Sequence, residues 1–189
     1  MATTTPHIIF IFDPDFRPEV EKHSGTPVSA CFQCMKCTNG CPITYAMDIM
    51  PNRLMRMIQL GLRDRVLSSS TIWICASCET CTTRCPNDID VARVMDCLRQ
   101  MSLRSKTVAE PHVPVFHQAF LEALRRTGRV HELEIIARYK LKSGNLMADA
   151  RLGWEMFKRG RLKLLPKTIA GLREVRRIFD RAGEGSAEP

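Results

Sequence analysis

The chain has 189 residues, of which 44% are hydrophobic, enough to bury the core of one domain, or of one domain with an appendage. Its formal net charge at pH 7 is +8, and residues 151–181 carry most of this excess, with ten Lys and Arg against three Asp and Glu. No aromatic platform or recognition motif accompanies the charge, which argues against nucleic-acid binding. The charge favours a solvated helical face and a docking surface for an acidic partner, with a membrane surface as the other candidate.

The N-terminal residues lack the basic segment of a signal peptide. The longest unbroken apolar run, residues 8–12, is far shorter than the roughly 20 residues that span a bilayer. We therefore expect a cytoplasmic protein without a transmembrane segment. In such a reducing compartment, nine cysteines favour metal binding over disulfides.

Residues 1–25 are predicted to form an N-terminal arm. Its apolar stretch at residues 7–12 fits either a strand or an extended segment lying on a partner. Pro14 and Pro18 follow this stretch. A short helix is predicted at residues 17–23, ended by Gly25.

Two copies of one cysteine run come next, and both read C-x2-C-x2-C-x3-C-P. The first contains Cys31, Cys34, Cys37 and Cys41, and the second contains Cys75, Cys78, Cys81 and Cys85. Three cysteines at two-residue gaps can wrap one side of a cubane in a single loop. The fourth, followed by proline, leaves that loop sharply. This spacing is typical of bacterial-type [4Fe–4S] proteins.

Zinc and disulfides are the alternative interpretations of these runs. A structural zinc site usually needs only two C-x2-C pairs, so zinc would leave the third and fourth cysteines of each run over. Disulfides are disfavoured because the sequence shows no secretory signal. We therefore interpret the eight cysteines as ligands of two [4Fe–4S] clusters, in a domain spanning residues 26–105.

The segment between the runs and the segment after them are both predicted to be helical. Pro51 suits the first turn of a helix that ends at Gly61, and a second short helix is predicted at residues 63–67. Asp88 or Asp90 can cap a helix running to about Arg104. Cys97, the ninth cysteine, lies near the apolar stripe of that helix and is interpreted as a small buried residue.

Four amphipathic helices are predicted in the remaining chain, at residues 115–127, 132–141, 146–158 and 166–179. The first is expected to bury Phe116, Phe120 and Leu124 and to end at Gly128. The last is expected to bury a stripe formed by Ile169, Leu172, Val175, Ile178 and Phe179. Together they make a helical extension over residues 106–183 that we expect to dock other subunits, followed by a flexible tail at residues 184–189.

These features resemble the α-helical ferredoxin family, and within it the C subunits of heterodisulfide reductase. The resemblance rests on the cysteine runs and on Pro51-Asn-Arg-Leu, Gln59-Leu-Gly61, Thr71-Ile-Trp73-Ile-Cys75 and Cys78-Glu-Thr-Cys81. It continues in Val115-Phe-His-Gln-Ala-Phe120, Thr127-Gly-Arg-Val130 and Tyr139-Lys-Leu141. The fold that the resemblance implies is all-α, a helical ferredoxin-like module with two [4Fe–4S] clusters and a C-terminal helical extension.

The resemblance also implies a set of ligands for each cluster. In two-cluster ferredoxins the fourth cysteine of one run completes the other cluster. Carried over to this chain, one cluster takes Cys31, Cys34, Cys37 and Cys85. The other cluster takes Cys75, Cys78, Cys81 and Cys41.

The implied function is electron relay between a flavin-containing A subunit and a B subunit that reduces a disulfide and carries adjacent-cysteine motifs. A hydrogenase or formate dehydrogenase module is a further candidate partner. The chain itself has no Cys-Cys pair, Gly-rich nucleotide fingerprint or P-loop, so we expect a non-catalytic subunit of an oxidoreductase complex. The alternative is an iron–sulfur subunit of a succinate, fumarate, glycerol-3-phosphate or glycolate dehydrogenase.

Overall fold

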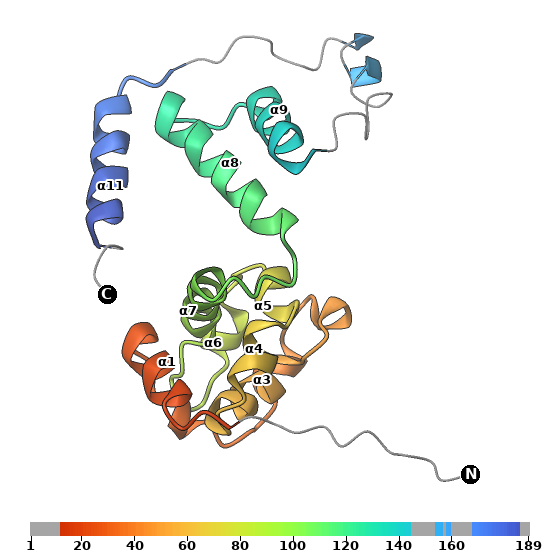
Figure 1. Ribbon diagram of the computed structural model, residues 1–189, viewed down its shortest axis with the longest axis vertical. Coiled ribbons are helices and arrows are strands. Elements are labelled where there is room, and N and C mark those ends of the chain that lie inside the picture. The colour runs from red at the N-terminus through yellow and green to blue at the C-terminus, as the bar shows by residue number, and fades with distance from the viewer. Residues whose placement is uncertain (1–11, 145–153, 157, 160–167, 186–189) are drawn as a thin grey trace. The chain divides into compact units, whose positions relative to one another are not determined.

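The computed structural model describes residues 12–144, 154–156, 158–159 and 168–185. All regular secondary structure in these ranges is helical, with no strand, so the predicted all-α class is confirmed. The chain divides into two compact units, Met1–Glu110 and Pro111–Pro189, and Figure 1 labels most of their helices. The domain boundaries that we predicted from the sequence stay a prediction. Most of the apolar stretch at residues 7–12 lies outside the described residues.

The core of the first unit is built on α7 (Val91–Arg104), against which α1 (Phe16–Ser24), α4 (Arg63–Leu67) and α5 (Thr71–Ile74) pack. The stripe of α7 is buried as its periodicity predicts: Val91, Val94, Met95, Leu98 and Met101 are at most 5% exposed. Each such side chain contributes roughly 1.5–3 kcal/mol when fully buried. Cys97 joins this core at 6% exposed, as expected for a small apolar residue.

Helix α3 (Pro51–Gln59) packs against α1 and α4. Its proline occupies the first turn, as predicted. The helices predicted at residues 17–23 and 63–67 are also present, and α4 has the predicted bounds. Asp90, rather than Asp88, caps α7: its carboxylate accepts a hydrogen bond from the backbone N–H of Arg93 at 3.0 Å.

The N-terminal segment is fastened to α4 by Arg63. Its guanidinium pairs with the carboxylates of Asp13 and Glu19 and lies over the ring of Phe16, 4.9 Å from the ring centre. The backbone N–H of Asp13 also donates to the carbonyl of Gly61 at 2.9 Å. These contacts hold α1 beside α3 and α4, which lie between the two cysteine runs in the chain.

Two very short helices complete the first unit. Helices α2 (Lys36–Asn39) and α6 (Thr80–Thr83) each contain the third cysteine of one run, and they contact each other. Turns η1 (Val28–Ala30) and η2 (Thr44–Ala46) precede the first run and follow it. The two runs therefore meet where α2 contacts α6.

The second unit contains α8 (His112–Thr127), α9 (Glu132–Ser143) and α11 (Leu172–Gly185). Gly128 ends α8 in the left-handed conformation, with φ 77°, as predicted. Helix α8 begins three residues earlier than predicted, because a proline is tolerated in the first turn, where Pro114 lies. The predicted inward face was wrong at Phe116, which is 45% exposed. The residues buried instead are small ones, Ala119, Ala123 and Thr127.

The prediction of a buried stripe on the last helix was also wrong at Ile178, which is 57% exposed. Ion pairs and a helix cap contribute to the packing of this unit: Arg125 pairs with Asp180 at 2.8 Å, and Arg176 donates to the last carbonyls of α8. Most of the helix predicted at residues 146–158, and the predicted helix start at Pro166, lie outside the described residues. In the described ranges, every helix is too short or too polar to cross a bilayer.

Candidate metal centres

Two cavities in the first unit are each lined by four cysteines. Site one is lined by Cys31, Cys34 and Cys37 from the first run and by Cys85 from the second. Site two is lined by Cys75, Cys78 and Cys81 from the second run and by Cys41 from the first. The structure thus brings all eight predicted ligands to two places, in the grouping that the ferredoxin resemblance implies. The space between the lining residues, including the part open to solvent, is about 320 Å³ at site one and 390 Å³ at site two.

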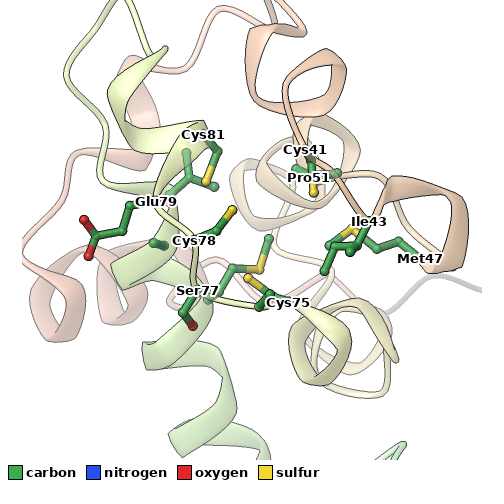
Figure 2. A pocket seen from close by; sticks show the side chains of 13 residues that line it. Cys41, Ile43, Met47, Pro51, Cys75, Ser77, Cys78, Glu79 and Cys81 are labelled. Carbon is green, nitrogen blue, oxygen red and sulfur yellow. The ribbon is translucent and has the colours of Figure 1, made fainter.

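Figure 2 shows how the cysteines of site two are arranged. The side chains of Cys41, Cys75, Cys78 and Cys81 point toward a common space, whereas Ser77 and Glu79 point away from it. Val91, at 2% exposed, lines both cavities and therefore lies between the two sites. The remaining walls are mainly apolar, from Ile43, Met47, Pro51 and Met95 at site two and from Met55 and Ile89 at site one.

The backbone of both runs turns in the same way around its cavity. The residues on either side of the second cysteine have positive φ: Gln33 (62°) and Met35 (65°) in the first run, and Ser77 (49°) and Glu79 (58°) in the second. Left-handed residues other than glycine cost roughly 1–3 kcal/mol each and persist where surrounding contacts hold them. The two positive φ angles recur at equivalent positions of both runs, so the two loops share one backbone shape around their cavities.

The exit of the first run is fastened to the segment that begins the second. The carboxylate of Asp48 accepts hydrogen bonds from the hydroxyls of Ser69 and Thr71, at 2.7 and 2.8 Å, and from backbone N–H groups of the same segment. The hydroxyl oxygen of Thr71 also accepts the backbone N–H of Ile49 at 3.0 Å and lies 2.6 Å from the carbonyl oxygen of Ile49. These hydrogen bonds hold the segment after Cys41 against the segment before Cys75, and both cysteines line site two.

The exit of the second run is fastened to the beginning of the first in the reciprocal way. The side-chain amide of Asn87, two residues after Cys85, donates to the carbonyl of Ala30, which precedes Cys31. The crossing of the fourth cysteines is therefore held by hydrogen bonds of the chain itself, on both sides.

A threonine after the third cysteine of each run binds the start of the next long helix. Thr38 donates to the Oδ1 of Asn52 at 2.7 Å and accepts from its backbone N–H at 3.1 Å. Thr82 donates to the carboxylate of Asp90 at 3.0 Å and accepts from the backbone N–H of Ala92 at 3.3 Å. The repeat therefore extends beyond the cysteine runs into α3 and α7.

The pKa values of the thiols are shifted in opposite directions by burial and by hydrogen bonding. Burial raises the pKa of Cys37, and it raises the pKa of Cys81 to about 11. A hydrogen bond with Thr80 lowers the pKa of the exposed Cys78. Because metal-bound cysteine is thiolate, binding iron at the buried positions would have to displace a proton.

The donor sets fit a cluster of several irons. In the described part of the chain, there is no group of three or more His, Cys, Asp or Glu side chains close enough together to hold a single metal ion. A cubane presents four irons that each take one thiolate, so its ligands surround a body rather than a point. Four cysteines around a mainly apolar cavity supply that arrangement at each site.

Several residues that shape these sites were missed by the sequence reasoning, among them Asp48, Asn52, Gln59 and Arg99. Aligning residues 51–59 with residues 91–99 would have revealed the extended repeat, since Arg53, Met55 and Ile58 correspond to Arg93, Met95 and Leu98. The helices repeat at a spacing of 40 residues and the cysteine runs at 44. One fixed spacing therefore does not align both.

Together, the helical fold and the two cavities with four cysteines each define a two-centre, α-helical ferredoxin-like protein. The family model of the 4Fe-4S dicluster domain matches residues 30–90, which contain all eight cysteines. Iron–sulfur clusters are therefore the cofactors of this domain.

The relatives refine the class. The chain is 32% identical over 108 residues to the iron-sulfur C subunit of the CoB–CoM heterodisulfide reductase of Methanopyrus kandleri, covering 53% of this chain and 56% of the relative. It is 28% identical over 103 residues to the C subunit of the H2:CoB-CoM heterodisulfide,ferredoxin reductase of Methanothermobacter marburgensis, covering 54% and 56%. It is 34% identical over 98 residues to the C2 subunit of the corresponding H2/formate enzyme of Methanococcus maripaludis, covering 47% and 53%.

The chain spans about half the length of these curated relatives. Over that half it is similar to the C subunits of heterodisulfide reductase.

Proposed function

We propose that this chain is an electron-relay subunit of a heterodisulfide reductase-type complex and holds two [4Fe–4S] clusters. Cys31, Cys34, Cys37 and Cys85 would ligate the cluster at site one. Cys75, Cys78, Cys81 and Cys41 would ligate the cluster at site two. The observation that carries the proposal is the grouping of the eight cysteines around two cavities, three from one run and one from the other.

The chain's own residues position the clusters and limit their contact with water. When bound, each cluster supplies the ability to take up and release one electron. The apolar residues around the cavities exclude solvent, and Val91 lies between the two sites. Because burial and hydrogen bonds to sulfur set the reduction potential of such clusters, these walls are the part of the relay that the protein controls.

The partners follow from the relatives and from the chemistry that this chain lacks. It has no adjacent cysteines and no nucleotide-binding fingerprint, so bond chemistry and two-electron exchange would belong to other subunits. We propose a B subunit with adjacent-cysteine motifs and a flavin-containing A subunit. A hydrogenase or formate dehydrogenase module is a further proposed partner, since two relatives are named for H2 or for H2 and formate.

Anaerobic co-purification with the chain as bait tests the complex. An adjacent-cysteine subunit and a flavoprotein are expected to be retained. Retention of a flavoprotein that reduces the chain with succinate, glycerol 3-phosphate or glycolate would contradict the proposal and favour a substrate dehydrogenase. Iron analysis of the same preparation should give about eight irons per chain, and clearly fewer would contradict two cubanes.

Serine variants test which cysteines share a cluster. Cys34→Ser and Cys78→Ser each change a ligand in the middle of one run, so they identify the electron paramagnetic resonance signals of site one and site two. Cys85→Ser is expected to alter the signal that Cys34→Ser alters, and Cys41→Ser the signal that Cys78→Ser alters. If Cys85→Ser instead altered the same signal as Cys78→Ser, each run would complete its own cluster and the crossed assignment would be wrong.

A further inference from the structure

Site one contains a chain of side-chain hydrogen bonds that ends on a cysteine sulfur. The hydroxyl of Thr38 donates to Asn52 at 2.7 Å, and the amide of Asn52 donates to the Oε1 of Gln33 in a longer contact of 3.5 Å. The Nε2 of Gln33 then donates to the Sγ of Cys31 at 3.3 Å. We name these three residues, Thr38, Asn52 and Gln33, the site-one relay.

The direction of the site-one relay is fixed from its buried end. The oxygen of Thr38 accepts the backbone N–H of Asn52 at 3.1 Å, so its proton is directed to the side-chain oxygen of Asn52. That places the NH2 group of Asn52 toward Gln33, and the NH2 group of Gln33 toward sulfur. Thr38 is 7% exposed and Asn52 is 9% exposed, which shelters the beginning of this series from water.

Site two lacks the same relay. In the second half of the repeat, Ala92 occupies the position equivalent to Asn52, and Ser77 occupies the position equivalent to Gln33. The hydroxyl of Ser77 accepts a hydrogen bond from Arg99 at 3.0 Å. The side-chain contact to sulfur at this site joins Cys78 and Thr80 at 3.4 Å, and it lies on an exposed cysteine where water competes.

Charges at equivalent positions of the two runs differ at three places. Arg84 stands in the second run where the first has Gly40, but it precedes Cys85 of site one and its side chain lies beside Gly40, which precedes Cys41 of site two, so it adjoins both sites. Met35 of the first run corresponds to Glu79 of the second, and Lys36 corresponds to Thr80. Arg99 adds a positive charge near site two, but it is paired with Asp96 at 2.6 Å. Arg56, which corresponds to Asp96, adds a positive charge near site one, because it donates to Gln59 at 3.1 Å and Gln59 binds the carbonyl of Cys31. The surroundings of site one therefore carry more positive charge than those of site two.

We infer that the site-one relay and these charges give the cluster at site one a higher reduction potential than the cluster at site two. Reduction adds one negative charge to a cluster. Hydrogen-bond donors to its sulfurs and nearby positive charges stabilise that added charge. An electron shared between the two clusters would then reside mainly at site one. This inference rests on the proposed two-cluster function and adds an order to it.

The test is a potentiometric titration of the anaerobically purified full chain with dithionite, followed by electron paramagnetic resonance. The signal that Cys34→Ser alters identifies site one. In the unaltered chain this signal is expected to appear at the higher potential. Gln33→Leu removes the donor to Cys31, and Asn52→Ala removes the group that orients it. Both variants are expected to shift the higher wave downward and to leave the lower wave in place.

Two further variants make the test specific. Asn39→Ala removes an exposed amide from the same run, and no side-chain hydrogen bond joins Asn39 to the described residues, so neither wave should move. Glu79→Met gives site two the residue of site one and is expected to raise the lower wave. The inference is overturned if Gln33→Leu moves the lower wave or moves neither. Fewer than about eight irons per chain would instead contradict the two-cluster function on which it rests.

Discussion

Gln59 and Arg99 hold equivalent positions in the two copies of the repeat in the first unit. Each donates a hydrogen bond to the carbonyl of the first cysteine of its own run. The Nε2 of Gln59 donates to the carbonyl of Cys31 at 2.9 Å and to that of Val28 at 3.0 Å. The guanidinium of Arg99 donates to the carbonyls of Cys75 and Ile72. Each long helix therefore holds the first turn of one cysteine loop through a single side chain.

Arg99→Leu is expected to loosen the loop at site two. It leaves the carbonyls of Cys75 and Ile72 without their charged donor, and hydrogen bonds to charged groups contribute roughly 1.5–3 kcal/mol. Arg99→Gln should have a smaller effect, because Gln59 shows that an amide can fill the equivalent position. The measurement is the rate at which a chelator removes iron from the purified protein.

About half of the iron should leave Arg99→Leu several-fold faster than it leaves the unaltered chain, and the other half at the original rate. The control is Arg93→Leu, which removes an exposed arginine from the same helix. Equal acceleration of all the iron would contradict a role confined to site two.

Asp48→Asn is expected to destabilise the first unit. The carboxylate of Asp48 accepts several hydrogen bonds from Ser69, Ser70 and Thr71, and the amide would place hydrogens opposite some of these donors. Since solvent reaches Asp48, we expect a loss of about 1–2 kcal/mol. This corresponds to a decrease of roughly 5–10 °C in Tm. Asp64→Asn, on the exposed side of α4, should change Tm little, and a similar decrease there would contradict a specific role for Asp48.

The effect of Asp48 should depend on pH. Burial by itself would raise the pKa of Asp48, but hydrogen bonds from Ser69, Thr71 and the backbone hold that pKa well below its usual range. A group with a lowered pKa in the folded state stabilises the fold above its unfolded pKa, about 3.9 for Asp. That stability is lost as the pH falls toward the folded pKa. The difference in Tm between the unaltered chain and Asp48→Asn should therefore be constant above about pH 5 and narrow below about pH 4.

Circular dichroism melts, recorded promptly after transfer to each pH, measure this difference. The comparison with Asp48→Asn separates the carboxylate from any acid loss of the clusters, because both proteins undergo that loss. A difference that stays the same down to pH 3 would contradict the assignment of the stability to the ionised carboxylate.

The two cysteine runs and most helices of the first unit could be predicted because their signals are local. Cysteine spacing depends on a few successive residues, and the stripe of α7 is a simple helical period. The contacts that cross the runs involve ordinary polar residues far apart in the chain, such as Asp48 and Thr71, and no local pattern marks them. The inward face of α8 was wrong for a related reason. The helix buries Ala119 and Ala123, and hydrophobicity alone ranks Phe116 above such small residues.

Gly61→Ala is expected to destabilise the first unit more than Gly25→Ala, although both glycines have left-handed backbones with φ of 69° and 64°. At either position alanine costs about 1 kcal/mol of backbone strain. A Cβ at Gly25 would meet open space, whereas a Cβ at Gly61 would overlap the carbonyl oxygen of Asp13. That carbonyl cannot move away easily, because the ion pair with Arg63 holds Asp13 in place. Overpacking of this kind adds roughly 1–3 kcal/mol, so Tm should fall by about 5 °C for Gly25→Ala and by roughly 10–20 °C for Gly61→Ala. Thermal melts of the two variants under the same conditions measure the difference, and equal decreases would show that the N-terminal segment does not pack against Gly61.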